Sequence, residues 1–173
     1  KRQLMSYVAG GQASLTSFAA SAVMFYLIAY TFTNLGTWAV VLAVEKEGGR
    51  GNLIEDFSGL GRTRPGLSLA MALFMLSLTG LPPTMGFVGK FYVFRAALES
   101  DYLWLALVGV ITSLISAYYY LRVIVVMWMR DGPGLAISTF PLNVTVALTA
   151  LVTLVFGVLP GPIIALLHDS VRG

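Results

Sequence analysis

One lysine lies deep inside an apolar stretch of this sequence, and its position marks a candidate functional site. Lys90 is nine positions before Glu99, so along a helix it lies about 13 Å from the polar end of its segment, near the middle of a hydrocarbon core of about 30 Å. A charge at that depth is costly and by default indicates a functional site. Snorkelling of the side chain to the membrane surface is the alternative, but Arg95 and Glu99 already occupy that end. We therefore take Lys90 as the candidate functional residue of this segment.

A helix break comes shortly before this lysine. Residues 67–79 form a charge-free apolar run. Four residues mark the break that follows it: Gly80, Pro82, Pro83 and Gly86. Proline removes a backbone donor and clashes with the preceding helical turn, so a continuous helix through Pro82-Pro83 is not expected. In a bilayer, backbone groups freed in this way must face protein or a water-filled cavity. The pattern predicts a discontinuous membrane helix over 66–99, with Lys90 beside the break.

The composition indicates a membrane protein. Of 173 residues, 57% are hydrophobic and 11% charged, whereas soluble domains carry about 25% charged residues, and the mean hydropathy is +0.82. The net charge of +3 is spread over loops without a basic cluster, so we expect no nucleic-acid partner. The chain has no cysteine, and its one histidine, His168, is interpreted as an interfacial residue rather than a ligand. We therefore expect no metal, no cofactor and no redox centre in this chain.

Four apolar runs predict an all-α, polytopic helical bundle in a single transmembrane region, in contact with the lipid bilayer. The expected spans are about 16–44, 66–99, 102–129 and 142–159, with a polar loop at 45–65. Only about 13 residues lie between Lys1-Arg2 and the first span, and Gly10-Gly11-Gln12 interrupts them, which is too short for another span. The chain begins with lysine rather than methionine, and we interpret it as a fragment of a larger protein.

Further polar side chains lie within the spans. Tyr26, Tyr30 and Thr33 follow one another at helical spacing, so they share a face, which would serve either interhelical packing or a proton path. Tyr119 and Arg122 are weaker candidates for the same roles. Arg122 lies about 10 Å from the end of its span, within snorkelling distance, so a structural anchor is favoured over a functional charge.

Charge asymmetry gives the expected orientation. The 45–65 and 130–141 loops lie on one side of a four-span bundle and carry five basic residues, against three on the other side. The positive-inside rule therefore favours these loops as cytoplasmic.

Three stretches resemble the antiporter-like subunits of respiratory complex I, NADH:quinone oxidoreductase. Residues 78–93, Leu-Thr-Gly-Leu-Pro-Pro-Thr-Met-Gly-Phe-Val-Gly-Lys-Phe-Tyr-Val, are similar to the discontinuous twelfth helix of that family. Residues 25–41 are similar to its eleventh helix and residues 118–123 to its thirteenth. The Gly-Lys-Phe-Tyr ending resembles subunit N rather than subunits L and M. The resemblance covers nearly the whole chain, as a C-terminal part with helices 11 to 14.

The resemblance implies a function and a setting. In the family the lysine of helix twelve transfers protons beside a polar, water-filled channel, and this role carries over to Lys90. Quinone reduction would take place elsewhere in the complex. The partners would be other membrane subunits of complex I, and the location a bacterial inner membrane. The family's other key acid and lysines lie in helices five, seven and eight, which the chain does not contain.

One departure from the family pattern concerns the first residues. In the family a Lys-Arg pair lies on the cytoplasmic side and opens helix ten, which contains a Tyr-Ser-Ser-x-x-His-x-Gly-Tyr motif. Here Val8 is followed at once by Ala9-Gly10, and the motif is absent. Either this part of the helix is deleted, or residues between Val8 and Ala9 are missing from the sequence, and we favour the second explanation.

Two other functions stay open. The chain could be a subunit of a multi-subunit cation/proton antiporter or of a membrane hydrogenase, although the Gly89-Lys90-Phe91-Tyr92 ending argues against it. It could also be an inert structural scaffold in which Lys90 is salt-bridged. Mutation of Lys90 separates the scaffold from the two transport functions.

Overall fold

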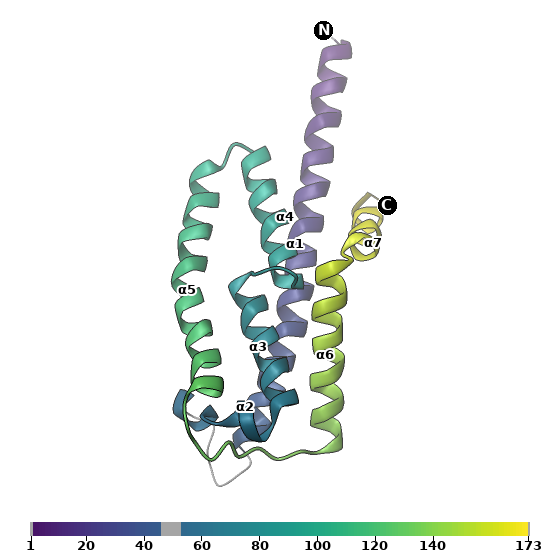
Figure 1. Ribbon diagram of the computed structural model, residues 1–173. Coiled ribbons are helices and arrows are strands. Elements are labelled where there is room, and N and C mark those ends of the chain that lie inside the picture. Colours follow the sequence, from purple (N-terminus) through teal and green to yellow (C-terminus); the bar gives the residue numbers. More distant parts are fainter. Residues whose placement is uncertain (1, 46–52, 173) are drawn as a thin grey trace.

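The computed structural model describes residues 2–45 and 53–172, and its elements there are helices. In chain order they are α1 (Arg2–Glu45), the 3-10 helix η1 (Ile54–Phe57), α2 (Leu60–Thr63), α3 (Pro65–Thr79), α4 (Met85–Glu99), α5 (Leu103–Met129), α6 (Phe140–Val158) and α7 (Gly161–Arg172). The long helices run alongside one another as a bundle (Figure 1). In the described part, Ser14–Glu45, Leu103–Met129 and Phe140–Val158 are long and apolar enough to cross a membrane. The predicted all-α membrane bundle is confirmed.

Helices α3 and α4 form the discontinuous span. Each has 15 residues. That corresponds to about 22 Å of helix, less than the roughly 30 Å of a hydrocarbon core. They follow each other in the same direction, with the break halfway up the bundle (Figure 1). The predicted discontinuity at Pro82-Pro83 is therefore present, and the peptide bond between the two prolines is cis.

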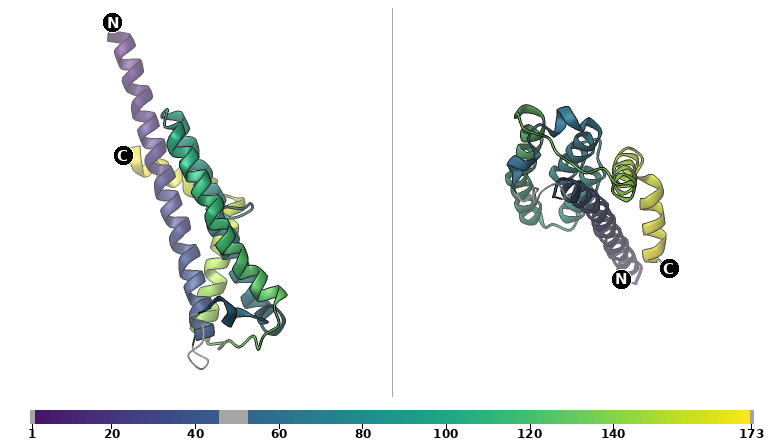
Figure 2. Two further views of the ribbon diagram at one scale, coloured as in Figure 1. Left: turned by 90° about the vertical axis from the view of Figure 1, so that its left-hand side faces the viewer. Right: turned by 90° about the horizontal axis from the view of Figure 1, so that it is seen from below.

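Helix α1 is longer than expected. It begins at Arg2 rather than near residue 16, and it continues through Gly10-Gly11 as one helix of 44 residues. A glycine inside a helix costs only about 1 kcal/mol and keeps its backbone hydrogen bond, so it weakens a helix without ending it. The first turns of α1 project beyond the other helices (Figures 1 and 2). The proposed gap between Val8 and Ala9 stays a prediction. The side chains of residues 2–10 and of His168 lie outside the described ones.

Helix α1 lies at the centre of the contacts between helices. Helix α1 contacts α3, α4, α6 and α7. Both termini lie at one end of the bundle, and the 130–139 connection lies at the other end with η1 and α2 (Figure 1). Buried apolar side chains fill the contacts between α1 and the broken span, with Phe74 packed in the lower half and Phe25 against Met85 in the upper half.

The outer helices leave apolar surface uncovered. In the most apolar 18-residue stretch of each helix, 11% of α5 and 17% of α6 is buried inside the bundle, against 39% of α1. Large side chains such as Leu114 and Leu151 are therefore available to lipid or to other protein. This is the pattern of a membrane bundle rather than of a water-soluble one.

Candidate functional site

Helix α3 ends in a way that leaves two of its carbonyl groups open. Gly80 follows the helix with φ at 87°, in the left-handed region that suits glycine. The backbone N–H groups of Gly80 and Leu81 donate to the carbonyl groups of Leu76 and Ser77, which is a Schellman motif. The last two carbonyl groups of the helix receive no backbone donor from this motif.

Lys90 supplies the missing donors. Its Nζ lies 2.8 Å from the carbonyl oxygen of Leu78 and 3.0 Å from that of Thr79, and it donates a hydrogen bond to each. The carbonyl end of a helix carries the negative end of its dipole, so it stabilises a cation. The ion pairs among the described residues do not include Lys90. Its ammonium is thus held by backbone oxygens rather than by a carboxylate.

The position of the Lys90 amine argues against two alternatives, a snorkelling lysine and a salt-bridged lysine. The Lys90 side chain bends back to the break and not towards the Glu99 end of α4, so it does not snorkel. The scaffold hypothesis requires a salt-bridged Lys90, and the described residues do not form such a salt bridge.

The Ser77 hydroxyl joins three helices next to the lysine. Its Oγ lies 3.1 Å from Thr33 Oγ1 of α1, and it accepts a hydrogen bond of 3.1 Å from the backbone N–H of Gly86 of α4. Ser77 itself is 2% exposed. A Cβ at Gly86 would overlap the Ser77 carbonyl oxygen, so glycine is what allows α4 to start this close to α3. Lys90 lies one helical turn after Gly86, and its reach to α3 depends on this contact.

The other residues of the break are also packed. Thr84 precedes α4 and accepts a hydrogen bond of 3.4 Å from the Phe87 N–H, as an N-cap does. Helix α6 approaches the break at Gly157, where a Cβ would overlap the backbone of Pro83 and Thr84. The break is therefore held between α1 and α6.

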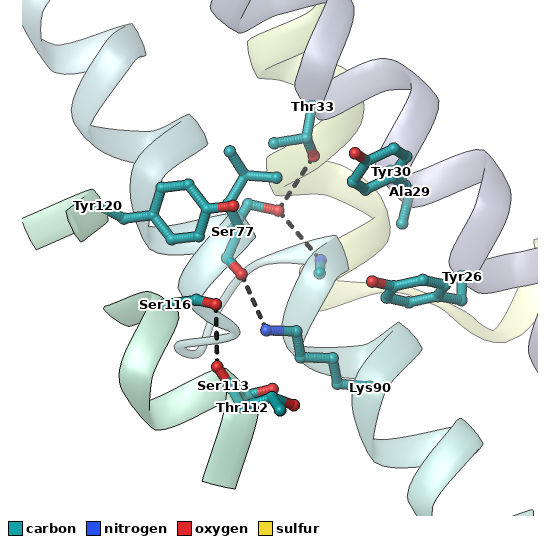
Figure 3. Close-up of a pocket in the computed structure, with 12 residues that line it drawn as sticks. Tyr26, Ala29, Tyr30, Thr33, Ser77, Lys90, Thr112, Ser113, Ser116 and Tyr120 are labelled. Atoms are coloured by element: carbon teal, nitrogen blue, oxygen red, sulfur yellow. Dashed lines mark hydrogen bonds between the residues drawn. The ribbon is translucent and has the colours of Figure 1, made fainter. Parts of the chain in front are cut away.

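A polar cavity of about 200 Å³ opens beside Lys90, between α1, α3, α4 and α5 (Figure 3). Eight of its twelve lining residues carry a hydroxyl group. The lining residues are Tyr26, Ala29, Tyr30, Thr33, Ser77, Leu78, Gly86, Lys90, Thr112, Ser113, Ser116 and Tyr120. A polar cavity of this size has room for several water molecules.

The groups that line the cavity can form hydrogen bonds with water. Thr112 and Ser116 donate to carbonyl groups of their own helix, both at 2.9 Å, so their oxygen lone pairs stay available as acceptors. A hydroxyl both donates and accepts, and with water it forms a chain along which a proton can move. Lys90 also lines an apolar cavity of about 260 Å³ beside Phe91 and Phe94, so its side chain lies between a polar and an apolar environment.

The structure brings some of the predicted site residues together. Tyr26 and Tyr30 line the polar cavity with Lys90. Tyr119 does not line it. That side chain is 59% exposed, and its ring packs on Tyr118 with 5.5 Å between ring centroids, while the next residue, Tyr120, lines the cavity instead.

Arg122 lies apart from the site. It donates to Glu55 at 3.4 Å, and Arg130 lies 3.9 Å from the same carboxylate. This is the placement of a structural anchor. The cavity residues that sequence reasoning missed are Ser77, Thr112, Ser113, Ser116 and Tyr120. Each is an ordinary polar residue in an apolar helix, and what distinguishes these residues from other polar residues is that they line the same cavity.

The fold and site define a polytopic membrane protein in which a broken helix places a lysine beside a hydroxyl-lined cavity. A family model described as NADH:quinone oxidoreductase/Mrp antiporter, TM, matches residues 4–116, and the chain belongs to this family. The predicted resemblance to antiporter-like subunits is thereby confirmed.

Named relatives agree with the family. The chain is 42% identical over 170 residues to NADH-quinone oxidoreductase subunit N of Trichlorobacter lovleyi, covering 96% of the chain and 35% of that protein. It is 48% identical over 146 residues to subunit N 1 of Herpetosiphon aurantiacus, covering 81% of the chain and 29% of that protein. The chain thus spans about a third of the length of the curated relatives it matches.

Two solved structures share the fold. A chain of respiratory complex I from Thermus thermophilus with bound aureothin superposes with a TM-score of 0.72 at 30% identity, covering 84% of this chain and 34% of that one. A chain of the Mrp complex from Dietzia sp. DQ12-45-1b gives a TM-score of 0.76 at 20% identity, covering 88% of this chain and 37% of that one. The latter likeness concerns the fold alone.

Proposed function

We propose that this chain is part of a membrane subunit of a proton-pumping NADH:quinone oxidoreductase, in which Lys90 takes up and releases the transported proton. The relatives named subunit N and the complex I neighbour at 30% identity support the assignment. The observation that carries it is the Lys90 ammonium, bound to the open end of a broken helix and facing a hydroxyl-lined cavity. In this proposal the chain holds no cofactor, quinone is reduced elsewhere, and the partners are other membrane subunits in a bacterial inner membrane.

The proposed mechanism couples the proton on Lys90 to the contact between α3 and α4. The protonated amine donates charge-assisted hydrogen bonds to the carbonyl groups of Leu78 and Thr79, which the dipole of α3 strengthens. When the ammonium passes a proton to water in the cavity, the neutral amine keeps its N–H donors but loses the charge that the helix end attracts. A change in the packing or hydration of the break then favours one protonation state over the other.

The test is proton pumping by the intact complex that carries Lys90→Ala. Membrane vesicles would be energised with NADH, with NADH oxidation and proton uptake followed in parallel. We expect loss of pumping, or of coupled turnover, in a fully assembled complex. Arg95→Ala is the matched control, because Arg95 is a cation of the same helix that pairs with Glu99 outside the cavity. Normal pumping by Lys90→Ala would refute the proton-transfer role.

A cation/proton antiporter subunit is the second candidate, because the family description covers both kinds of protein and the Mrp chain shares the fold. The two candidates differ in their driving force. Proton movement that needs NADH oxidation supports the oxidoreductase. Exchange of Na⁺ for protons without NADH, abolished by Lys90→Ala, would support the antiporter instead.

A further inference from the structure

An apolar groove runs between α3 and α6, away from the Lys90 site. Its volume is about 590 Å³. The walls include Leu69, Leu73 and Leu76 of α3 and Ala147, Ala150 and Leu154 of α6. Helix α6 is long and apolar enough to cross a membrane, and α3 is a shorter apolar helix beside it. A groove of this composition accepts a hydrocarbon chain or another apolar side-chain surface.

Next to the groove, at the end of the bundle where η1 and α2 lie, is a cavity with both polar and apolar lining residues. This second cavity has a volume of about 270 Å³, and Arg64 and Ser138 are among its lining residues. The groove and the cavity share Gly66, Leu67 and Asn143, so they form one continuous depression. Asn143 donates to the Ser138 oxygen at 2.8 Å, which leaves the Ser138 hydroxyl hydrogen free to donate to a bound group.

Arg64 brings a positive charge to this cavity, and the ion pairs within 4 Å among the described residues do not include it. The other arginines with described side chains are each within 4 Å of a carboxylate: Arg62, Arg95, Arg122 and Arg130. Arg64 is exposed and directly precedes Pro65, the first residue of α3. The amide end of α3 therefore adds to the charge with the same sign. A guanidinium in this position is suited to a phosphate, which it binds through two parallel hydrogen bonds.

We propose that this depression binds an anionic phospholipid, with its phosphate at Arg64 and one acyl chain in the groove between α3 and α6. The side chains along the depression follow the order of groups in such a lipid. A cation lies at one end for the phosphate, hydroxyl and amide groups come next, and leucine and alanine side chains lie beyond them for the acyl chain. A zwitterionic lipid also has a phosphate, but its quaternary amine would add positive charge beside Arg64. A phosphatidylglycerol-like headgroup avoids this repulsion.

The test is photo-crosslinking of lipid to the intact complex. The purified complex would be reconstituted in phosphatidylcholine vesicles that contain a small fraction of phosphatidylglycerol with a diazirine on its acyl chain. After illumination, crosslinked peptides would be identified by mass spectrometry. We expect crosslinks in residues 69–76 and 147–154. Arg64→Gln should reduce them about tenfold, as loss of one charge-assisted contact does, and Arg64→Lys, which keeps the charge but loses the paired hydrogen bonds, should reduce them less than Arg64→Gln does.

Two controls keep the proposal falsifiable. Arg62→Gln removes a neighbouring arginine that is paired with Asp131, and it should leave the crosslinks unchanged. Ala147→Phe fills the groove without touching the charge and should abolish them. Absence of crosslinks in the unmodified complex would show that another part of the protein covers the groove, which overturns the proposal. Equal crosslinking by diazirine phosphatidylcholine, insensitive to Arg64→Gln, would show ordinary boundary lipid and would also overturn it.

Discussion

At the scale of single residues, two side chains hold the break in place. Lys90 closes the carbonyl end of α3, and Ser77 joins α3 to α1 and to the start of α4. Lys90 completes the helix end and lines the polar cavity at once, so under the proposed function a change in its protonation would act on the contact between α3 and α4.

Removal of the Ser77 hydroxyl should weaken the break. In Ser77→Ala the buried Gly86 N–H and the Thr33 hydroxyl lose their common partner, at a cost of about 1–3 kcal/mol. We expect a lower midpoint in thermal unfolding of the purified complex. Thr33→Val, which removes one bond instead of two, should lower it less. Thr112→Ala is the control, since that exposed hydroxyl bonds only to its own helix among the described residues. A Ser77→Ala variant as stable as the parent would contradict this role.

Part of this site follows from the sequence, and part requires the folded chain. Lys90 stands out because a charge inside an apolar span is rare. Tyr26 and Tyr30 follow from their helical spacing. Tyr120 rather than Tyr119 could have been chosen from the sequence, because Thr112, Ser116 and Tyr120 follow one another at four-residue spacing and therefore share one face of α5. Ser77 could not be found in this way, because its partner Gly86 is brought close only by the fold of the break.

At the scale of elements, the break depends on glycine as much as on proline. Gly80 and the two prolines predict that the helix ends. In the structure α3 ends before them and α4 begins after them. Glycine pairs are weaker predictors, as the unbroken course of α1 through Gly10-Gly11 shows. The difference is physical, because proline removes a hydrogen bond whereas glycine only lowers helix propensity.

A methyl group at Gly86 should push α4 away from α3. The Cβ of Gly86→Ala would overlap the Ser77 carbonyl oxygen, which is backbone and cannot move aside cheaply. Overpacking of this kind costs about 1–3 kcal/mol, so we expect a lower unfolding temperature and weaker proton pumping per NADH. Gly11→Ala is the matched control, since a Cβ at Gly11 meets nothing within 4 Å and favours the helix. Equal stability of the two variants would show that α4 is not packed this tightly.

The ion pair between η1 and α5 should matter little. Arg122 and Glu55 are both about half exposed, at 44% and 52%, and exposed pairs contribute at most about 1 kcal/mol. We expect Arg122→Gln to leave both the unfolding temperature and proton pumping almost unchanged. Loss of pumping in a stable, assembled Arg122→Gln complex would instead favour a functional charge at this position.

At the scale of the whole molecule, two indicators of orientation disagree. The excess of basic residues places the 45–65 and 130–141 loops in the cytoplasm, whereas the resemblance places the Lys1-Arg2 pair there. The structure makes the two incompatible, because α1 starts at Arg2 at the opposite end of the bundle from the 130–139 connection (Figures 1 and 2). One of them must be wrong, or the first residues belong to a different helix in the complete protein.

Cysteine labelling decides between the two orientations. Asp131→Cys lies in the 130–139 connection and Ser100→Cys in the turn between α4 and α5, both exposed and at opposite ends of the bundle. The chain has no cysteine of its own, so the modified peptide reports the position unambiguously in mass spectrometry. With a membrane-impermeant maleimide, we expect Asp131→Cys to react in inside-out vesicles and Ser100→Cys in right-side-out vesicles. The opposite result would reject the charge argument and support the family orientation. The expected result would also place Arg64 on the cytoplasmic side of the membrane.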